Sequence, residues 1–169
     1  MDFQQFGITP ETVQYLIRLL VATLLGGVIG FEREAKDRPA GLRTHMLTAL
    51  AAALFTVLTM ELHEDLNRAD PNNSADPLRI IEAVTAGVAF LAAGAIIQSR
   101  GKVQGITTGA GMWLAGAVGV ACGSGHYALA VISMLLATAV LALLRPLEKR
   151  WITGAAEDGP KPARRAERD

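Results

Sequence analysis

A dense group of charged and titratable side chains lies between residues 32 and 45. Two glutamates, three arginines, a glycine, a threonine and a histidine make up this cytoplasmic motif cluster: Glu32, Arg33, Glu34, Arg38, Gly41, Arg43, Thr44 and His45. Arginines beside a helix start can hold an anion. Glutamates can instead bind a cation together with backbone oxygens. An internal ion-pair network that anchors the loop is the third interpretation, and the spacing leaves all three open.

Individual members of this cluster suggest narrower roles. Gly41 permits a close approach of backbone, and Thr44 is a candidate cap for a following helix. His45 could titrate near neutral pH and sense it, or be a satisfied residue at a membrane interface. Thr107 and Thr108 are expected on the same side, at the start of a later helix, and are counted with the cluster.

Two further charges, Arg18 and Glu82, lie inside apolar stretches. A charge in a membrane-spanning helix is costly unless it is paired or hydrated. Counted from the same end of their helices, the two residues differ in depth by about 6 Å, which an arginine side chain can bridge. We expect them to form an intramembrane charged pair; the alternative is that each side chain extends outward to water.

The sequence contains no recognisable catalytic motif. The patterns G-x-S-x-G, H-E-x-x-H and G-x-x-x-x-G-K-[ST] are all absent. The single cysteine, Cys122, cannot form an intramolecular disulfide and lies in an apolar run, where it is expected to be a small buried hydrophobe. A formal net charge of zero gives no support to nucleic-acid binding. We therefore expect neither an enzyme nor a nucleic-acid partner.

Long uncharged runs separate the charged clusters. Residues 103–144 carry no formal charge, and as one helix they would be about 63 Å long, about twice the thickness of the hydrocarbon core. Two helices use this length, with a break at Gly123-Ser124-Gly125. The sequence predicts an all-α integral membrane bundle of five transmembrane helices, at about residues 12–31, 44–61, 79–98, 104–122 and 126–145. Residues 1–145 form this domain, and 146–169 are expected to be a disordered polar tail.

Lysine and arginine are concentrated in alternate connections. They are frequent between the first two predicted spans and after the last span. The positive-inside rule then places the N-terminus outside and the C-terminus in the cytoplasm. The apolar N-terminal run carries no positive segment or cleavage site, so it is expected to remain as a helix. Asp76 and Arg79 form an outer motif, in which Asp76-Pro77 is expected to precede the third span as a cap.

Small residues recur along the predicted spans. Because lipid supplies no hydrophobic force between helices, close packing must hold a membrane bundle together. The residues expected to pack are Gly26, Gly30, Gly87, Gly94 and Trp113. A permeation path lined by backbone is the other interpretation of the glycines, and a homodimer on a G-x-x-x-G face is a further one.

Three sequence blocks resemble the MgtC/SapB family. They are GGVIGFEREAKDRPAGLRTHMLTALAAALF, DPLRIIEAVTAGVAFLAAGAII and VQGITTGAGMWLAGAVGVACGSGHY, and they occur in the family's order. The family usually has Gln where this chain has Glu82. Longer members also carry a C-terminal domain of ACT-like fold, whereas only a polar tail follows Pro146 here, so activities of that domain are not expected.

This resemblance implies a multi-pass protein of the bacterial inner membrane, linked to magnesium limitation and, in pathogens, to virulence and survival inside macrophages. Its expected action is to regulate other membrane proteins, including the ATP synthase, and thereby membrane potential and ion transport. The alternative is a transporter or channel for magnesium or another small solute. No cofactor is expected, and magnesium stays open as a ligand. A continuous polar path would favour transport, but only Glu82 provides a carboxylate inside a predicted span.

Overall fold

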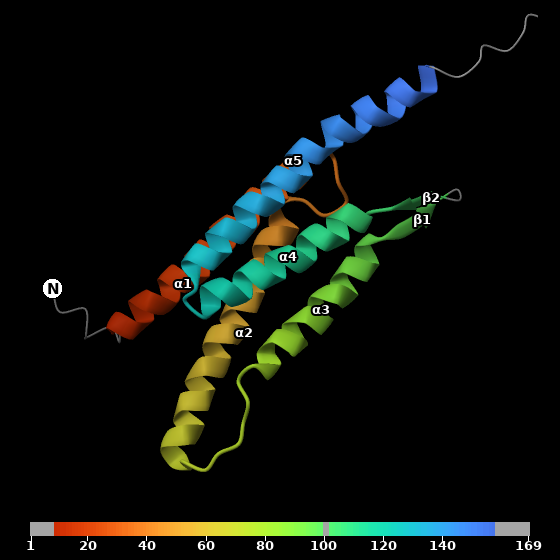
Figure 1. Ribbon diagram of the computed structural model, residues 1–169. Helices are drawn as coiled ribbons and strands as arrows, with labels where there is room; N and C mark the ends of the chain where they lie inside the picture. The colour runs from red at the N-terminus through yellow and green to blue at the C-terminus, as the bar shows by residue number, and fades with distance from the viewer. Residues whose placement is uncertain (1–8, 100–101, 158–169) are drawn as a thin grey trace, which may run out of the picture.

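The structure is a computed structural model that describes residues 9–99 and 102–157, with side chains described at 9–96 and 103–142. The helices are α1 (Pro10–Glu34), α2 (Leu42–Ala69), α3 (Arg79–Ala95), α4 (Ile106–Gly123) and α5 (Tyr127–Glu157). A short hairpin, β1 (Ile97–Ser99) and β2 (Lys102–Gln104), joins α3 to α4. The all-helical class is confirmed apart from this hairpin. Figure 1 shows α4 in the middle of the bundle and the hairpin projecting from one end.

The first two helices are longer than the predicted spans. The Thr9 hydroxyl accepts a 3.2 Å hydrogen bond from the Thr12 amide, and Pro10 opens α1. Helix α2 continues to Ala69, eight residues past the predicted end at 61. An ion pair between Glu64 and Arg68 supports the added turns, before Asp70 and Pro71 end the helix.

The connection from α3 to α4 differs from the prediction. Helix α3 ends at Ala95 rather than at residue 98, because the chain turns into antiparallel strands in which Ile97 pairs with Gln104. Gly105 then takes a φ of 90°, a left-handed conformation that suits glycine, and opens α4. The hairpin shortens α3 to 17 residues.

The turn between α4 and α5 lies where the glycine-rich break was expected. Helix α4 ends at Gly123, and Gly125 has a φ of 81°. Helix α5 then continues to Glu157, past the predicted end at 145. Residues 146–157, expected as the start of a disordered tail, are therefore helical, and 158–169 lie outside the described residues.

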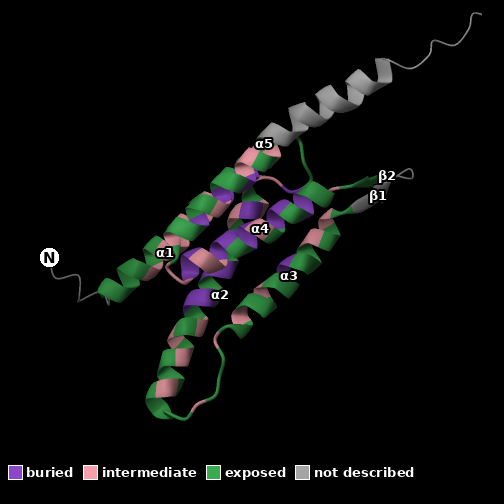
Figure 2. Cartoon of the chain, in the orientation of Figure 1, coloured by how far each residue is buried: buried purple, intermediate pink, exposed green. Residues whose placement is uncertain are grey.

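The core forms where α1 and α2 meet α4. Figure 2 shows buried residues concentrated on α4 and on the facing parts of α1 and α2. The contacts are between backbones: a Cβ added at Gly26 would lie 2.7 Å from the His45 carbonyl oxygen, and one at Gly123 would lie 2.7 Å from that of Ala53. Gly30 meets the Leu42 backbone in the same way, at 2.8 Å. Gly26 and Gly30 therefore lie in close contact with α2 within the chain.

Helix α3 lies at the edge of this core. Val88 is its only buried residue, and it contacts α4 at Gly116. A Cβ at Gly87 or Gly94 would meet nothing within 4 Å, and Trp113 is 52% exposed. Gly87 and Gly94 of α3 and Trp113 of α4 therefore make no close packing contact within the single chain, and Figure 2 shows most of α3 as exposed or intermediate.

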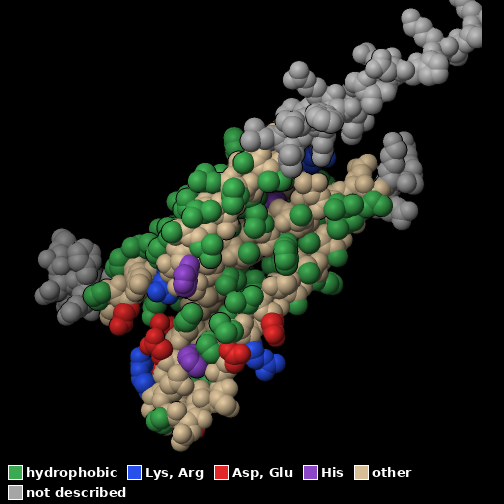
Figure 3. All heavy atoms as spheres, viewed as in Figure 1, with side chains coloured by type: hydrophobic (Ala, Val, Ile, Leu, Met, Phe, Trp, Pro, Cys, Tyr) green, Lys and Arg blue, Asp and Glu red, His purple; other side chains and the backbone are tan. Residues whose placement is uncertain are grey.

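The outer surface of the bundle is apolar. Leu24, Phe31 and Phe90 are 65%, 66% and 80% exposed, and Figure 3 shows hydrophobic side chains over most of the visible body. Apolar patches of this extent are typical of a membrane or protein contact. By length and composition, α1, α2 and α4 are able to cross a membrane, while the apolar part of α5, Tyr127–Ala142, is shorter in the described residues. The chain is thus an all-helical protein with three candidate membrane spans.

Candidate functional site

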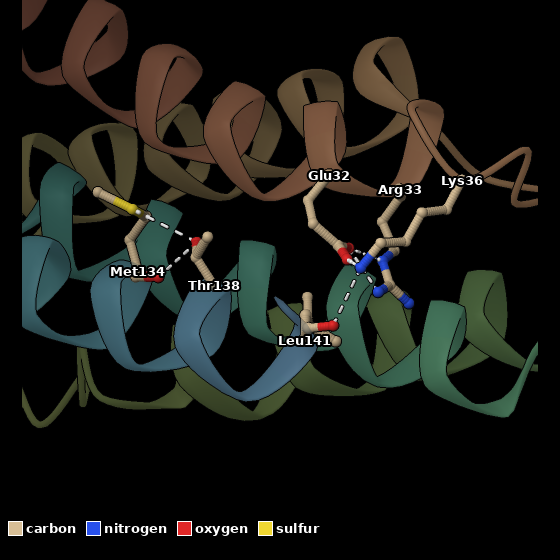
Figure 4. Close-up of polar contacts among 6 residues, drawn as sticks. All are labelled: Glu32, Arg33, Lys36, Met134, Thr138 and Leu141. Carbon is tan, nitrogen blue, oxygen red and sulfur yellow. Dashed lines mark hydrogen bonds and ion pairs between the residues drawn. The ribbon is translucent and has the colours of Figure 1, made fainter. Parts of the chain in front are cut away.

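The end of α1 carries a buried ion-pair network. Figure 4 shows the side chains of Arg33 and Lys36 converging on the carboxylate of Glu32, with which both form ion pairs, and Leu141 of α5 beside them. The Lys36 ammonium donates a 3.2 Å hydrogen bond to the Leu141 carbonyl oxygen. The side chains of Arg33 and Glu32 are only 4% and 11% exposed. Arg33 can be buried because Glu32 compensates its charge. The ion-pair interpretation of the cluster therefore holds for this part of it.

Lys36 is a member of this network that sequence analysis missed. It was counted only as a positive loop charge, although it lies four residues after Glu32, the spacing at which helical side chains pair. Its second bond, to α5, joins residues far apart in the chain and has no local sequence signal. The network therefore ties the start of the α1–α2 loop to α5.

Glu34 has a separate role at the start of α2. Its carboxylate oxygen Oε2 accepts a 2.8 Å hydrogen bond from the Leu42 amide. A side chain at Gly41 would overlap this carboxylate and displace it from the Leu42 amide. Thr44 was expected to cap α2, but the helix begins at Leu42 and Thr44 lies inside its first turn. The cap of α2 is thus supplied by the last residue of α1.

A polar hollow of 460 Å³ opens beside this cap. Its lining residues are Glu34, Asp37, Arg38, Pro39, Gly41, Arg43 and Thr44. Asp37 has a φ of 50° and turns the chain between the helices. Arg38 and Arg43 are exposed, and no ion pair reaches either of them within the described part of the chain. The free arginines leave the hollow able to attract an anion, although Glu34 already occupies the first amide of α2.

His45 is fully buried inside the bundle. Its Nδ1 lies 2.9 Å from the Gly41 carbonyl oxygen. Thr108 is buried as well, with 1% of its surface exposed, whereas the neighbouring Thr107 is exposed. The structure therefore divides the predicted cluster into a buried set and a surface set.

Arg18 does not pair with Glu82. Its Nη1 donates a 2.9 Å hydrogen bond to the Gly123 carbonyl oxygen at the end of α4. Glu82 is exposed, and no ion pair joins it to Arg18 in the described residues. The depth comparison ignored which side of the bundle each residue faces: α1 packs against α2, α4 and α5, whereas α3 packs mainly on α4. The intramembrane pair is thus replaced by a contact between α1 and the α4–α5 turn.

The outer motif has one local role. The Asp76 carboxylate accepts a 2.9 Å hydrogen bond from the Leu78 amide at the entry to α3. Arg79 is exposed. Asp76 therefore caps the turn before α3, in the position where the sequence predicts a cap.

The remaining hollows are apolar grooves beside α3, α4 and α5. They have volumes of 550, 350 and 380 Å³. The first lies between α3, α4 and the start of α5, the second between α2 and α3, and the third between α4 and α5. No three His, Cys, Asp or Glu side chains come together as a metal site in the residues that the structure describes. The polar chemistry of the described chain is therefore concentrated at the helix ends.

Comparisons with known proteins place this arrangement in a family. The chain matches the MgtC family over residues 19–150. It is 35% identical over 139 residues to the "Putative magnesium transporter YhiD" of Escherichia coli, covering 82% of this chain and 64% of that protein. It is 41% identical over 126 residues to "Protein MgtC" of Brucella abortus, covering 75% and 49%.

A third relative is "Uncharacterized protein slr0014" of Synechocystis, 37% identical over 137 residues, with 81% of this chain and 55% of that protein covered. The chain thus spans about half to two thirds of the length of these relatives. No solved structure matches it. The match covers the buried Glu32–Lys36 network, the α2 cap and all of α4, and the chain belongs to the MgtC family.

Proposed function

We propose that this chain is a multi-pass protein of the bacterial inner membrane that binds and regulates other membrane proteins. In this proposal all five helices cross the bilayer, the N-terminus is outside and the C-terminus is in the cytoplasm. The apolar surface supports it, as does the Lys and Arg content of the α1–α2 loop. Helix α3 has 17 residues, the lower end of the length that a spanning helix needs, which is about 17–25 residues.

The observation that carries this proposal is the closed contact between α1, α2 and α4. At Gly26, Gly119 and Gly123 even one added methyl group would overlap a neighbouring helix. A solute path between these helices would need space for the solute and groups to replace its water. The helices instead present exposed apolar faces, and in α3 Val88 alone is buried. A protein built in this way is suited to binding through its faces.

The family suggests which proteins are bound. We propose the ATP synthase as a partner, with an effect on membrane potential and ion transport during magnesium limitation. In a pathogen this action would support virulence and survival inside macrophages. A homodimer is part of the same proposal, and the exposed Gly87 and Gly94 offer a surface on which two α3 helices could approach closely.

A second candidate is a magnesium transporter. The printed name of the Escherichia coli relative favours it. Glu82 also favours it, because it is an exposed carboxylate in the first turn of α3. Magnesium keeps most of its waters and prefers carboxylate ligands. One carboxylate per chain would require several copies to assemble into a ring around the path.

A flux assay separates the two candidates. Purified protein in liposomes is followed with an internal magnesium dye, next to Glu82→Gln and the matched control Glu64→Gln. Glu64 is exposed on the outer turns of α2, away from α3. The regulatory proposal expects no uptake from folded protein. Uptake that Glu82→Gln abolishes and Glu64→Gln preserves would establish the transporter instead.

Partner binding is tested in native membranes. ATP synthase subunits should co-purify with the tagged chain and be lost with Gly94→Leu, which adds bulk to the open face of α3. Ala128→Leu introduces the same leucine side chain at an exposed position of α5 and serves as the control. Equal co-purification with both variants would contradict binding through α3, and absence of the synthase from all samples would contradict that partner.

A further inference from the structure

The buried ring of His45 has one defined hydrogen bond. The residue lies in the first turn of α2 with 0% of its surface exposed. Its Nδ1 is 2.9 Å from the Gly41 carbonyl oxygen. Since a carbonyl oxygen only accepts hydrogen bonds, Nδ1 carries the hydrogen. In the neutral ring, Nε2 is then an acceptor with a free lone pair.

Nothing polar meets Nε2. The atom is buried and has no hydrogen-bond partner. It faces α4 at Gly111, where an added Cβ would lie 3.1 Å from it. A Cα hydrogen of Gly111 points in this direction and makes at most a weak contact with the lone pair. A proton on Nε2 would therefore create a charged N–H donor that faces a C–H group and has no acceptor.

The ring is also confined on its other side. A Cβ at Gly30 would lie 2.9 Å from the His45 Cβ, and one at Gly26 would lie 2.7 Å from the His45 carbonyl oxygen. Helix α1 is thus in direct contact with His45 and leaves no room for the ring to move toward it. A protonated ring can find water only if α4 moves away from α2.

The charges around His45 do not provide the missing acceptor. In α1, Arg33 opposes a positive ring and Glu32 favours it, but Glu32 is engaged by Arg33 and Lys36. In α4, Ile106–Gly123, Cys122 is the only titratable residue, and it lies near the opposite end. On α2 itself the neighbouring charge is Arg43, which is exposed and of the same sign as the protonated ring.

We propose that His45 is a proton-binding site whose protonation separates α4 from α2. The neutral ring fits the closed contact, whereas the protonated ring fits only a position of α4 that admits water. A ligand that binds the open state better shifts the population toward it. Acidification therefore opens the contact between α2 and α4, and this conclusion is independent of the partner that the protein binds.

The first measurement follows the ring itself. The protein is labelled with ¹⁵N-histidine in liposomes, and the His45 signals are identified by their loss in His45→Gln. At about pH 7.5 we expect hydrogen on Nδ1 and none on Nε2, and a growing fraction of rings with hydrogen on both nitrogens as the pH is lowered to about 5.5 and below. A hydrogen on Nε2 at the higher pH, or a ring that stays neutral at the lower one, would overturn the proposal.

The second measurement follows the contact. Cys122, the single cysteine, is fully buried in α4 and reports on separation from α2. At about pH 5.5, maleimide should react about tenfold faster with Cys122 of the wild type than with Cys122 of His45→Gln. The cost of burying an N–H donor without a partner shifts the equilibrium toward the open contact by at least that factor. At about pH 7.5 the two rates should agree. Comparing variants at one pH cancels the thiol's own pH dependence.

His63→Gln and His126→Gln are matched controls, because they remove the other two histidines. Both should react at the wild-type rate at either pH. Equal rates in wild type and His45→Gln at the lower pH, or an effect of either control, would contradict the proposal. If His45→Gln unfolds and reacts rapidly throughout, the ¹⁵N titration, assigned with the two control variants, decides alone.

Discussion

The Arg18 guanidinium donates a 2.9 Å hydrogen bond to the carbonyl oxygen of Gly123, so a residue of α1 holds the last residue of α4. The final carbonyls of a helix lack partners within it, and the helix dipole makes that end favourable for a cation. Arg18 supplies both a hydrogen-bond donor and a positive charge at the end of α4. A charge inside an apolar helix is thereby explained by the end of another helix rather than by an acidic partner.

Replacing Arg18 with Met should weaken the bundle. The Gly123 carbonyl would lose its donor, and a hydrogen bond to a charged group contributes about 1.5–3 kcal/mol to stability. Unfolding in SDS–detergent mixtures, followed by circular dichroism, measures the loss. The stability of Arg18→Lys, which keeps the charge, should lie between that of Arg18→Met and that of the wild type. A Met variant as stable as wild type would show that this contact contributes nothing.

Glu32→Gln should be strongly destabilising. Arg33 would remain almost fully buried with no carboxylate beside it, and breaking a buried pair from one side costs about 3–5 kcal/mol. The same unfolding assay should show recovery in the double variant Glu32→Gln with Arg33→Met, which removes the isolated charge. If the double variant is no more stable than Glu32→Gln, burial of Arg33 does not depend on Glu32.

Two glycine substitutions should have opposite effects on the stability of the folded protein. Gly119→Ala places a methyl group against the Ala49 carbonyl and Ala52, and overpacking of this kind costs about 1–3 kcal/mol. Gly87→Ala meets nothing within 4 Å and should stabilise α3 by about 0.5–1 kcal/mol through lower backbone entropy. Thermal unfolding of both purified variants tests the pair, and a destabilising Gly87→Ala would contradict the open face.

The proposed orientation predicts which loops can be labelled. In a Cys122→Ala background, Ser74→Cys lies between α2 and α3, and Ala35→Cys follows α1. A membrane-impermeant maleimide should label Ser74→Cys in intact spheroplasts and Ala35→Cys only after permeabilisation, because the α1–α2 loop carries the positive charges. The reverse pattern would invert the orientation, and labelling of both in intact cells would contradict the five-span arrangement.

The sequence predicts helix positions better than helix neighbours. Hydropathy and the glycine break locate all five helices, since both are local properties. The partner of Arg18 could not be found in this way, because position along a helix does not determine which neighbour a side chain faces. The α4–α5 turn lies at the same depth as Arg18, and only the assembled bundle shows this.

Some local signals were present but too short to decide the structure. The extension of α2 has the pair Glu64 and Arg68 at helical spacing. The β1–β2 strands are three residues each, below the usual strand length of about 5–6 residues. In the cluster at residues 32–45 the sequence identifies the residues but does not predict which of them are buried. In the structure His45 and Arg33 are buried, whereas Arg38 and Arg43 are exposed.

The central position of α4 has a consequence for biogenesis. Helices α1, α2, α3 and α5 all pack against α4, yet it is the fourth helix to leave the ribosome. While α4 is being translated, α1 and α2 are held together through Gly26, Gly30 and the Glu34 cap, but α3 has no firm attachment. In the proposed membrane arrangement, a nascent chain that ends before α4 therefore has a formed α1–α2 hairpin and an α3 that lacks its main packing partner.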